Sequence, residues 1–283
     1  MNKALILISI ICYLNILSRD FKARKNINAL SDEELKNLRE SLQFLYELPN
    51  DDRRSYAYWA GIHGYPLDKC WHAPRDVDGW PQVHLFLCWH RAYLYYLEKQ
   101  LQDRNKSVSI PYWDWRTNND QTSQIPRAFR ERVINNKPNP LYEYRINFPN
   151  HNNNHTTIRN PGKGSVRNLP TTGTVSYILN TFNHFEDFSE RIRNVHNLVH
   201  LWVGGDMADQ RYAGFDFIFH AHHCHIDKIW FDWQRRHGIN NVPDYYLDMV
   251  LEPFNATVGK MLDPYVLGYE YVEEEIKIEE ASQ

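Results

Sequence analysis

Two widely separated clusters of histidine constrain the fold of this chain more than any other feature of its sequence. The first lies in GIHGYPLDKCWH and HLFLCWHRAYL and offers His63, His72, His84 and His90. The second lies in VHNLVHLWVGG and FDFIFHAHHCHIDKIW and offers His196, His200, His220, His222, His223 and His225. Imidazoles gathered within apolar sequence need polar partners, and metal ions are good ones. We therefore expect the fold to bring these two segments together around metal.

The spacing within the second cluster favours a metal site on helices. His196 and His200 are four residues apart. On a helix they would lie about 40° apart on one face and one turn apart, so both could reach the same ion. A pair, His222 and His223, follows inside an aromatic run. A helix of hydrogen-bonded core histidines is a weaker interpretation of so dense a cluster.

The identity of the metal follows from what the clusters lack. A zinc protease of the HExxH type needs a glutamate between its histidines, and this chain has HNLVH there. A di-iron bundle needs glutamates and ExxH motifs, which are not placed as such a site requires. Neutral imidazoles in two sets of three suit a pair of copper ions. We expect two copper ions that cycle between Cu2+ and Cu+, with molecular oxygen as the co-substrate.

The third ligand of the first cluster is contested. His63 and His90 are the clear candidates for two of the positions. If one helix held both His84 and His90, their six-residue separation would place them about 120° apart, a poor shared face. His72 has Cys70 two residues before it, which makes its surroundings chemically distinctive. Both His72 and His84 remain candidates.

The periodicity of the sequence predicts a mainly α fold. Ser31 and Glu34 form a capping box, and leucines recur at helical spacing after it, so residues 31–47 are expected to form a helix. Residues 116–180 are rich in Asn, Thr, Pro and Gly and are expected to form a long irregular excursion. We predict a four-helix bundle that holds a dicopper centre, with long irregular loops and little β structure. The helices that could carry ligands are expected over residues 53–61, 87–103, 187–203 and 226–236.

The two ends of the chain are expected to lie outside the folded core. Residues 1–18 combine a basic start with an apolar run too short to span a bilayer, which is typical of a secretory signal peptide. The dicopper domain is expected over residues 19–283, with its core at about 24–271 and an acidic tail at 272–283. We therefore expect a secreted, extracellular protein.

The composition narrows the class of partner. With 32 Lys and Arg against 35 Asp and Glu, no nucleic-acid or stable membrane association is predicted. The 9 Trp, 18 Tyr and 13 Phe help to line a pocket for an aromatic guest. Sequons at Asn105, Asn154 and Asn255 fit a secreted glycoprotein. Cys88 and Cys224 are expected to be small buried hydrophobes.

The motifs around both clusters resemble those of the tyrosinase, catechol oxidase and molluscan-haemocyanin family of coupled dicopper proteins. They follow the family order and cover roughly residues 24–271. The matching motifs are HG-x-P, C-x-H, F-L-x-W-H-R-x-Y-L, P-Y-W-D-W, H-N-x-V-H-x-W-V-G-G, D-x-I-F-x-x-H-H-x-x-I-D-K-x-W and L-G-Y-E-Y.

The resemblance implies a set of copper ligands and one covalent bond. His222 would lie beside the second ion without binding it. Cys70 matches a cysteine that in some members forms a thioether with the middle histidine, here His72. The implied ligands are His63, His72 and His90 for the first ion and His196, His200 and His223 for the second.

The resemblance also implies residues that act on substrate. Phe219 matches a phenylalanine that lines the substrate pocket. Asn197 matches an asparagine that, in some tyrosinases, helps a water molecule to deprotonate a phenol. The acidic partner of this water would be Glu190 or Asp187, and Arg193 stands where a glutamate is often found.

The implied activity is that of a copper-dependent monophenol and ortho-diphenol oxidase, which oxidises small phenols or catechols to ortho-quinones with oxygen. Catechol oxidation is the firmer expectation, because hydroxylation of a monophenol needs a positioned base. Cys88 and Phe217 replace two prolines of the family pattern, which should loosen helix starts without abolishing copper binding. The alternative is a haemocyanin-like oxygen-binding protein without turnover.

Overall fold

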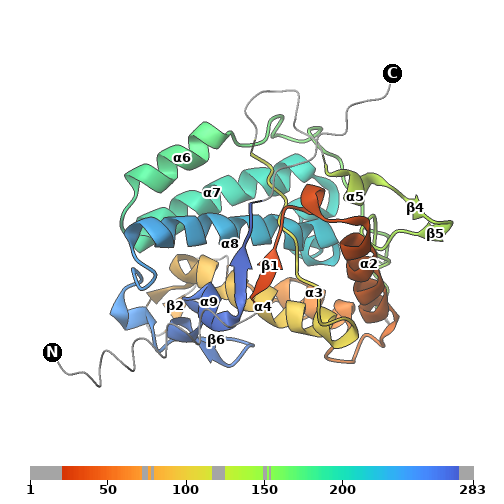
Figure 1. Ribbon diagram of the computed structural model, residues 1–283, viewed down its shortest axis with the longest axis horizontal. Coiled ribbons are helices and arrows are strands. Elements are labelled where there is room, and N and C mark those ends of the chain that lie inside the picture. Colours follow the sequence, from red (N-terminus) through yellow and green to blue (C-terminus); the bar gives the residue numbers. More distant parts are fainter. Residues whose placement is uncertain are drawn as a thin grey trace.

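Three long helices form the centre of the fold. They are α4 (Phe86–Arg104), α7 (Phe185–Val203) and α8 (Phe217–His237). Figure 1 shows α7 and α8 side by side, with α4 and the shorter α3 (Tyr56–His63) below them. These four helices carry the described histidines of both clusters except His84, which lies in a 3-10 turn just before α4. The predicted class, a mainly α bundle with little β structure, is confirmed.

The structure is a computed structural model that describes residues 21–71, 76–77, 80–116, 125–148, 152 and 154–273. The expected signal peptide (1–18) and nearly all of the expected acidic tail (272–283) lie outside these residues. His72 also lies outside them, and with it the expected thioether to Cys70.

The first helix confirms the prediction from its capping box. In α2 (Asp32–Glu47) the Ser31 hydroxyl accepts the backbone N–H of Glu34 at 3.2 Å, and the Glu34 carboxylate accepts the backbone N–H of Ser31 at 2.8 Å. Leu38, Leu42 and Leu45 are buried. The helix thus packs its leucine face inward, against α3 and α4.

The helix that carries the second half of the second cluster begins earlier than the sequence predicts. We expected it over residues 226–236, but α8 begins at Phe217. The Asp216 side chain caps it by accepting the N–H of Ile218 at 3.1 Å. Most of its residues are buried, so tertiary packing outweighs the modest helix propensity of the Phe and His run. As a result every histidine from 220 to 225 is helical.

The long excursion contains more structure than expected. Residues 172–180 were expected to be irregular, yet they lie in α6 (Thr172–Thr181), which packs on α7. The Thr171 hydroxyl caps this helix, and Val175, Ile178 and Leu179 are buried at helical spacing. The rest of the described excursion is mostly irregular. It holds only α5 (Arg127–Arg130) and a hairpin of β4 (Val133–Ile134) and β5 (Lys137–Pro138).

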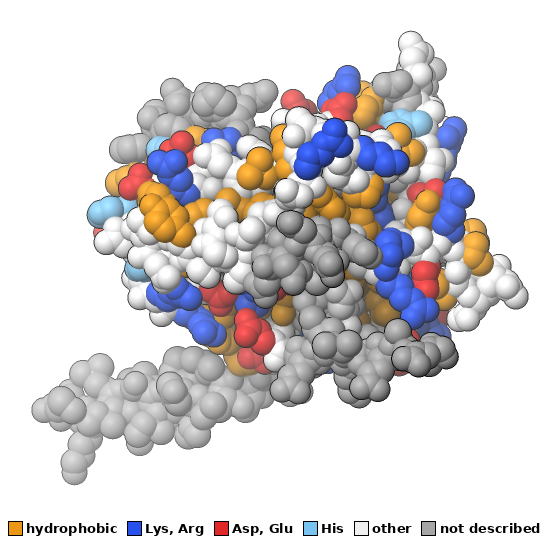
Figure 2. Space-filling model, turned by 90° about the horizontal axis from the view of Figure 1, so that it is seen from above, with side chains coloured by type: hydrophobic (Ala, Val, Ile, Leu, Met, Phe, Trp, Pro, Cys, Tyr) orange, Lys and Arg blue, Asp and Glu red, His pale blue; other side chains and the backbone are white. Residues whose placement is uncertain are grey.

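The strands are short and lie in pairs. β1 (Lys22–Arg24) runs parallel to β8 (Tyr269–Tyr271), so the two ends of the described domain meet. The remaining elements are β2 (Asp76–Val77), β3 (Trp80–Pro81), β6 (Val250–Leu251), β7 (Ala256–Thr257) and α9 (Pro264–Leu267). None of the helices in the described part of the chain has both the length and the apolar character needed to cross a membrane. On the face seen in Figure 2, basic and acidic side chains are interspersed.

A buried cluster of charges joins the two ends of the domain to its central helices. Asp227 of α8 accepts from Arg91 of α4 at 2.5 Å and from Arg24 of β1 at 3.3 Å. The hydroxyls of Tyr269 and Tyr271 donate to the same carboxylate at 2.7 and 2.5 Å. Burial by itself would raise the pKa of Asp227, but the two guanidinium groups hold it below its ordinary value. The cluster therefore stays ionised and connects four elements.

The two cysteines expected to be buried hydrophobes are buried. Cys88 lies in α4 and Cys224 in α8, each fully shielded from solvent. Burial raises the pKa of both thiols to about 12. Since the thiolate is the reactive form, both cysteines are chemically quiet at neutral pH.

Candidate metal centre

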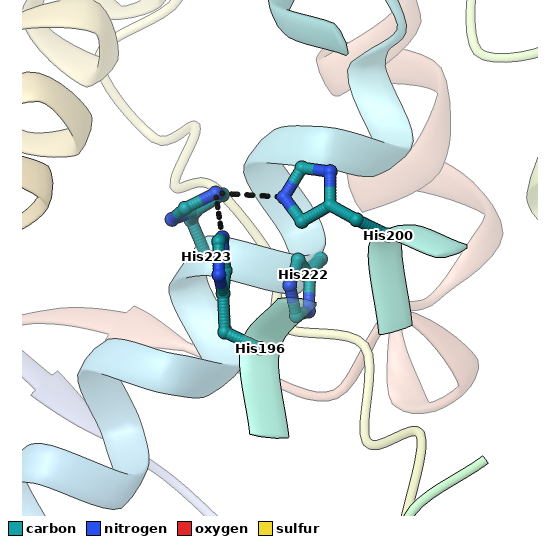
Figure 3. Close-up of side chains that lie close together, drawn as sticks. All are labelled: His196, His200, His222 and His223. Carbon is teal, nitrogen blue, oxygen red and sulfur yellow. Dashed lines mark hydrogen bonds between the residues drawn. The ribbon is translucent and has the colours of Figure 1, made fainter. Parts of the chain in front are cut away.

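Two neighbouring helices build the second histidine group. His196 and His200 lie one turn apart on α7, and His222 and His223 lie on α8 (Figure 3). One nitrogen from each of the four rings can be chosen so that all four lie within 4.8 Å of one another. The Nε2 atom of His223 is 3.1 Å from Nε2 of His196 and 3.4 Å from Nε2 of His200. This spacing allows three imidazoles to point at one ion.

Neighbouring carbonyl oxygens fix the tautomers of three histidines. Nδ1 of His200 lies 2.6 Å from the Met207 carbonyl, and Nδ1 of His90 lies 2.8 Å from the Phe86 carbonyl. A carbonyl only accepts, so each Nδ1 carries the proton. Nδ1 of His196 is likewise 3.0 Å from the side-chain oxygen of Asn197. The Nε2 lone pairs are thereby left to face the centre, as in metal-binding histidines.

The first group lies directly against the second. His63 is the last residue of α3 and His90 lies in α4. Both are buried, and together with Cys70 they offer ligand atoms within 4.8 Å of one another. The rings of His90 and His223 stack with centroids 4.2 Å apart, which joins the two groups into one centre. Two ions held here would be close neighbours.

The donor set fits copper. Burial lowers the pKa of His63 and His223 well below the ordinary value, and nearby imidazoles lower it further. Burial also lowers the pKa of His200 to about 4, although its hydrogen bond to Met207 acts in the opposite direction. Neutral imidazole is the form that binds metal. No carboxylate belongs to either group, so the ligands are those that suit copper rather than hard cations.

The described part of the chain places one of the two contested histidines away from the first group. Nδ1 of His84 lies 2.8 Å from the hydroxyl of Tyr246, and its backbone carbonyl accepts from Ser189 of α7 at 3.0 Å. The group that could hold the first ion contains Cys70 and does not contain His84. His84 thus connects the turn before α4 to Tyr246 and to Ser189 of α7 by hydrogen bonds. The position of His72 lies outside the described residues.

Two of the three residues expected to act on substrate lie at the centre. The Phe219 ring lies between the groups, with its centroid 4.5 Å from that of His63 and 4.1 Å from that of His223. Asn197 is half-buried and contacts His196. Glu190 is exposed, and its six-residue separation from His196 turns it about 120° around α7. Asp187 is exposed as well, so neither acid points at the histidines.

Two residues of these groups, His222 and Cys70, were not expected from the sequence to bind metal. His222 was expected beside the second ion, but a nitrogen of its ring lies within the second group. Its ring stacks on that of His196, with centroids 5.0 Å apart. Cys70 was singled out only as the partner of His72, yet its sulfur is 3.5 Å from Nε2 of His90. The feature of the sequence that could have identified His222 as a possible ligand is its position directly before His223.

The family comparison agrees with this geometry. Residues 53–236 match the family described as the common central domain of tyrosinase. The chain is 32% identical over 218 residues to a tyrosinase of Streptomyces antibioticus, an alignment that covers 66% of this chain and 78% of that protein. It is 30% identical over 258 residues to the Hemocyanin G-type, units Oda to Odg, of Enteroctopus dofleini. That alignment covers 84% of this chain and only 8% of the octopus protein, a small part of its length.

Solved structures show the same fold. A functional unit of octopus haemocyanin superposes with a TM-score of 0.71 at 26% identity, covering 88% of this chain and 67% of that one. A tyrosinase from Burkholderia thailandensis superposes with a TM-score of 0.72 at 20% identity, covering 93% of this chain and 75% of that one. Proteins named as enzymes and proteins named as haemocyanins are thus both similar to this chain.

Proposed function

Since this chain belongs to the tyrosinase family, we propose that it is a dicopper phenol oxidase, which oxidises catechols, and less readily monophenols, to ortho-quinones with molecular oxygen. The observation that carries the proposal is the pair of facing imidazole groups, stacked through His90 and His223. The family binds two copper ions, and this arrangement offers four imidazoles in one group and two imidazoles with a cysteine sulfur in the other.

Each histidine has a definite task in this proposal. His63, His72 and His90 hold the first copper ion, and His196, His200 and His223 hold the second. The carbonyls of Phe86 and Met207 keep the Nδ1 protons of His90 and His200 in place, so that Nε2 faces the ion. When bound, the two copper ions supply the redox chemistry that couples oxygen reduction to phenol oxidation.

The remaining residues orient the substrate and remove its proton. Phe219 offers the aromatic ring of a phenol an edge or face to pack on, between the two groups. A free phenol has a pKa of about 10, so a monophenol needs help to lose its proton. Asn197 can hold a water molecule for this step with its amide group. The exposed position of Glu190 does not favour it as the partner of that water, which is why catechol oxidation is the main activity proposed.

Secretion through a signal peptide at residues 1–18 is part of the same proposal, as is glycosylation of the sequons. Asn255 is exposed and adopts a positive φ in the turn between β6 and β7. Asn105 is half-buried at the C-terminal end of α4. Of these two, Asn255 presents its side chain at the surface, where a glycan could be attached.

The proposal is tested by oxygen consumption of the copper-loaded protein, offered first a monophenol and then a catechol. We expect steady turnover of the catechol and slow or no turnover of the monophenol. Equal turnover of both would mean a working water-activating site. Reversible oxygen binding without turnover would identify an oxygen carrier, the alternative that the similarity to haemocyanins supports. Absence of both oxygen binding and turnover would overturn the dicopper proposal.

A separate prediction concerns the third ligand of the first copper ion. We expect His72→Ala to reduce the copper content from two ions per chain to one, and His84→Ala to leave it at two, because Nδ1 of His84 is engaged with Tyr246. Copper content is measured by atomic absorption after gel filtration. The opposite pattern would transfer the ligand role to His84.

A further inference from the structure

A short segment of the long excursion, residues 158–162, closes the C-terminal end of α7. The backbone N–H groups of Asn160 and Gly162 donate to the carbonyls of Val203 and Trp202, both at 2.8 Å. These carbonyls belong to the last turn of the helix, where the helix itself supplies no further N–H groups. The turn that follows α7 is therefore built directly against this segment.

One buried aspartate fastens that turn to the same stretch of chain. The backbone N–H of Asp206 donates to the Ile158 carbonyl at 3.0 Å, and its Oδ2 accepts the N–H of Ile158 at 2.7 Å. The other carboxylate oxygen, Oδ1, lies 2.6 Å from Nε2 of His155. Asp206 is only 6% exposed. Three contacts thus hold this carboxylate and its backbone to residues 155 and 158.

The residue after Asp206 holds a proposed copper ligand. The carbonyl of Met207 accepts the Nδ1 proton of His200 at 2.6 Å, which leaves Nε2 to face the centre. Asp206 and Met207 lie together in one short 3-10 turn, Gly205–Ala208. A displacement of the Asp206 backbone would therefore move the carbonyl that orients His200. In this way a contact made by His155 can reach the metal site.

The positive charge opposite Asp206 comes from a histidine. In the described part of the chain, His155 is the basic side chain within ion-pair distance of this carboxylate, and its side chain is 33% exposed. Asp209 and Arg211 also line the surface hollow beside His155, but they form an ion pair with each other at 2.6 Å. Tyr212 contributes its ring, edge-on to the imidazole at 5.1 Å between centroids. The charge of His155 thus depends on pH, while its nearest charged neighbours are already paired.

We propose that His155 and Asp206 are positioning residues for the second copper ion, and that their ion pair makes this copper site sensitive to pH. The inference rests on the proposed dicopper function, because it takes His200 as a ligand. A protonated His155 holds the buried carboxylate, and with it the turn that orients His200. When His155 loses its proton, the carboxylate stays buried without a countercharge, which is unfavourable. The turn is then held less firmly.

The sign of the expected pH dependence distinguishes this pair from the copper ligands. Protons compete with metal for the ligand imidazoles, so the ligands alone bind copper more tightly as pH rises. The pKa of His200 is lowered to about 4 by burial, so this competition has ended well below neutral pH. The ion pair acts in the opposite direction, because it is present at low pH and is lost as pH rises through the titration of His155.

Release of copper to a chelator tests this inference. Copper-loaded protein is mixed with excess EDTA at about pH 5.5 and at about pH 8, and the copper remaining per chain is followed in time. The wild-type protein should release its second ion about fivefold faster at the higher pH, less than the 10- to 100-fold effect of a group that touches a ligand directly. The kinetic phase of the second ion is the one that is missing in His200→Ala.

Substitutions at the ion pair separate charge from shape. His155→Arg keeps the charge at both pH values, so release should stay slow at both. His155→Gln removes the charge, so release should be fast at both. Asp206→Asn should behave like His155→Gln, because the amide oxygen can still accept from Ile158 but carries no charge. Fast release from His155→Arg at both pH values would overturn the proposal, because the charge would then have no effect.

His237 provides the matched control. It is half-buried at the end of α8, and its Nε2 lies 3.2 Å from the Leu179 carbonyl rather than from an acid. His237→Gln should keep the fivefold difference of the wild-type protein, which also accounts for any pH dependence of the chelator. A difference of wild-type size in His155→Gln would overturn the proposal, and so would loss of the difference in His237→Gln.

A measurement without copper separates this inference from the proposed function. In copper-free, 15N-labelled protein, the hydrogen-bonded Nδ1 proton of His200 should give a downfield NMR resonance that is missing in His200→Ala. The Nδ1 proton of His90, held by the Phe86 carbonyl, is the internal reference. Relative to it, exchange of the His200 proton with water should accelerate as His155 loses its charge, and should not do so in His155→Arg.

The two failures then look different. If no phenol is oxidised, the proposed oxidase function fails, while the resonance of His200 still decides whether His155 positions that side chain. If catechol is oxidised but neither the exchange of this proton nor the release of copper responds to the charge of His155, the inference fails and the oxidase function stands.

Discussion

The His200→Ala variant is expected to bind one copper ion per chain in place of two and to lose at least ~100-fold in the rate of oxygen consumption with a catechol. Removing even an outer hydrogen-bond partner of a metal ligand costs roughly 10- to 100-fold in affinity or activity, and removal of a ligand costs more. The Nε2 of His200 lies 3.4 Å from that of His223, and its Nδ1 is held by the Met207 carbonyl. Among the described side chains, His222 is the one that could take the place of His200 as a ligand, and it would have to shift to do so.

Copper analysis and an oxygen electrode measure this effect, and His184→Ala controls for it. His184 lies at the N-terminal end of the same helix, is exposed and makes no side-chain cap. Its replacement should leave both copper ions and full turnover. The assignment of the second site would be wrong if His200→Ala kept two ions and full activity. If His222→Ala lost the ion and His200→Ala did not, the ligand role would belong to His222.

The largest effect on stability is expected from Asp227→Ala. Removing one partner of a buried ion pair costs about 3–5 kcal/mol, because the remaining charges stay buried without compensation. Here two guanidinium groups would be left, with Arg24 fully buried and Arg91 fully buried. The free energy of unfolding is measured by urea titration. Arg24 would keep its ion pair with Glu98 at 3.1 Å, so the lost stabilisation comes mainly from the ion pair of Arg91 with Asp227.

Two further variants keep this prediction decisive if Asp227→Ala does not fold. Tyr271→Phe removes one hydroxyl that donates to Asp227 and should cost about 1–2 kcal/mol. Asp232→Ala, on the same helix, breaks an ion pair with Lys228 in which the aspartate is 22% exposed. It should cost less than ~1 kcal/mol. Similar losses in Asp227→Ala and Asp232→Ala would contradict a special role for the buried cluster.

The sequence predicted the boundaries of a helix where hydrogen bonds between residues a few positions apart set them. The capping box of Ser31 and Glu34 was enough to place α2, because its hydrogen bonds lie within one turn. The start of α8 could not be predicted in the same way. The Phe and His residues from 217 to 225 have weak helix propensity, so the cap from Asp216 alone does not predict the helix, and burial of the segment in the core stabilises it. Thr171 and the buried face of α6 were hidden in a segment of loop-like composition.

For the metal centre, sequence spacing predicted which histidines share a helix but not how the two groups meet. Four-residue spacing placed His196 and His200 on one face of α7. The stacking of His90 on His223 joins α4 to α8, and no spacing encodes a contact over that length of chain. The tautomers depend on backbone carbonyls such as that of Met207, which any residue type could supply.

The parallel pairing of β1 with β8 has a consequence for how the domain can be rebuilt. Lys22 lies opposite Tyr269 and Arg24 opposite Tyr271, so residue 272 lies four residues further along the strand direction than residue 21, a separation of roughly 14 Å. A linker of a few glycines can join them, and new ends can open at the β4–β5 turn, where Asn135 and Asn136 adopt positive φ. Such a circular permutant would leave each histidine on the helix that carries it, although α7 and α8 would now precede α3 and α4 along the chain. Its new termini would be far in sequence from both histidine groups.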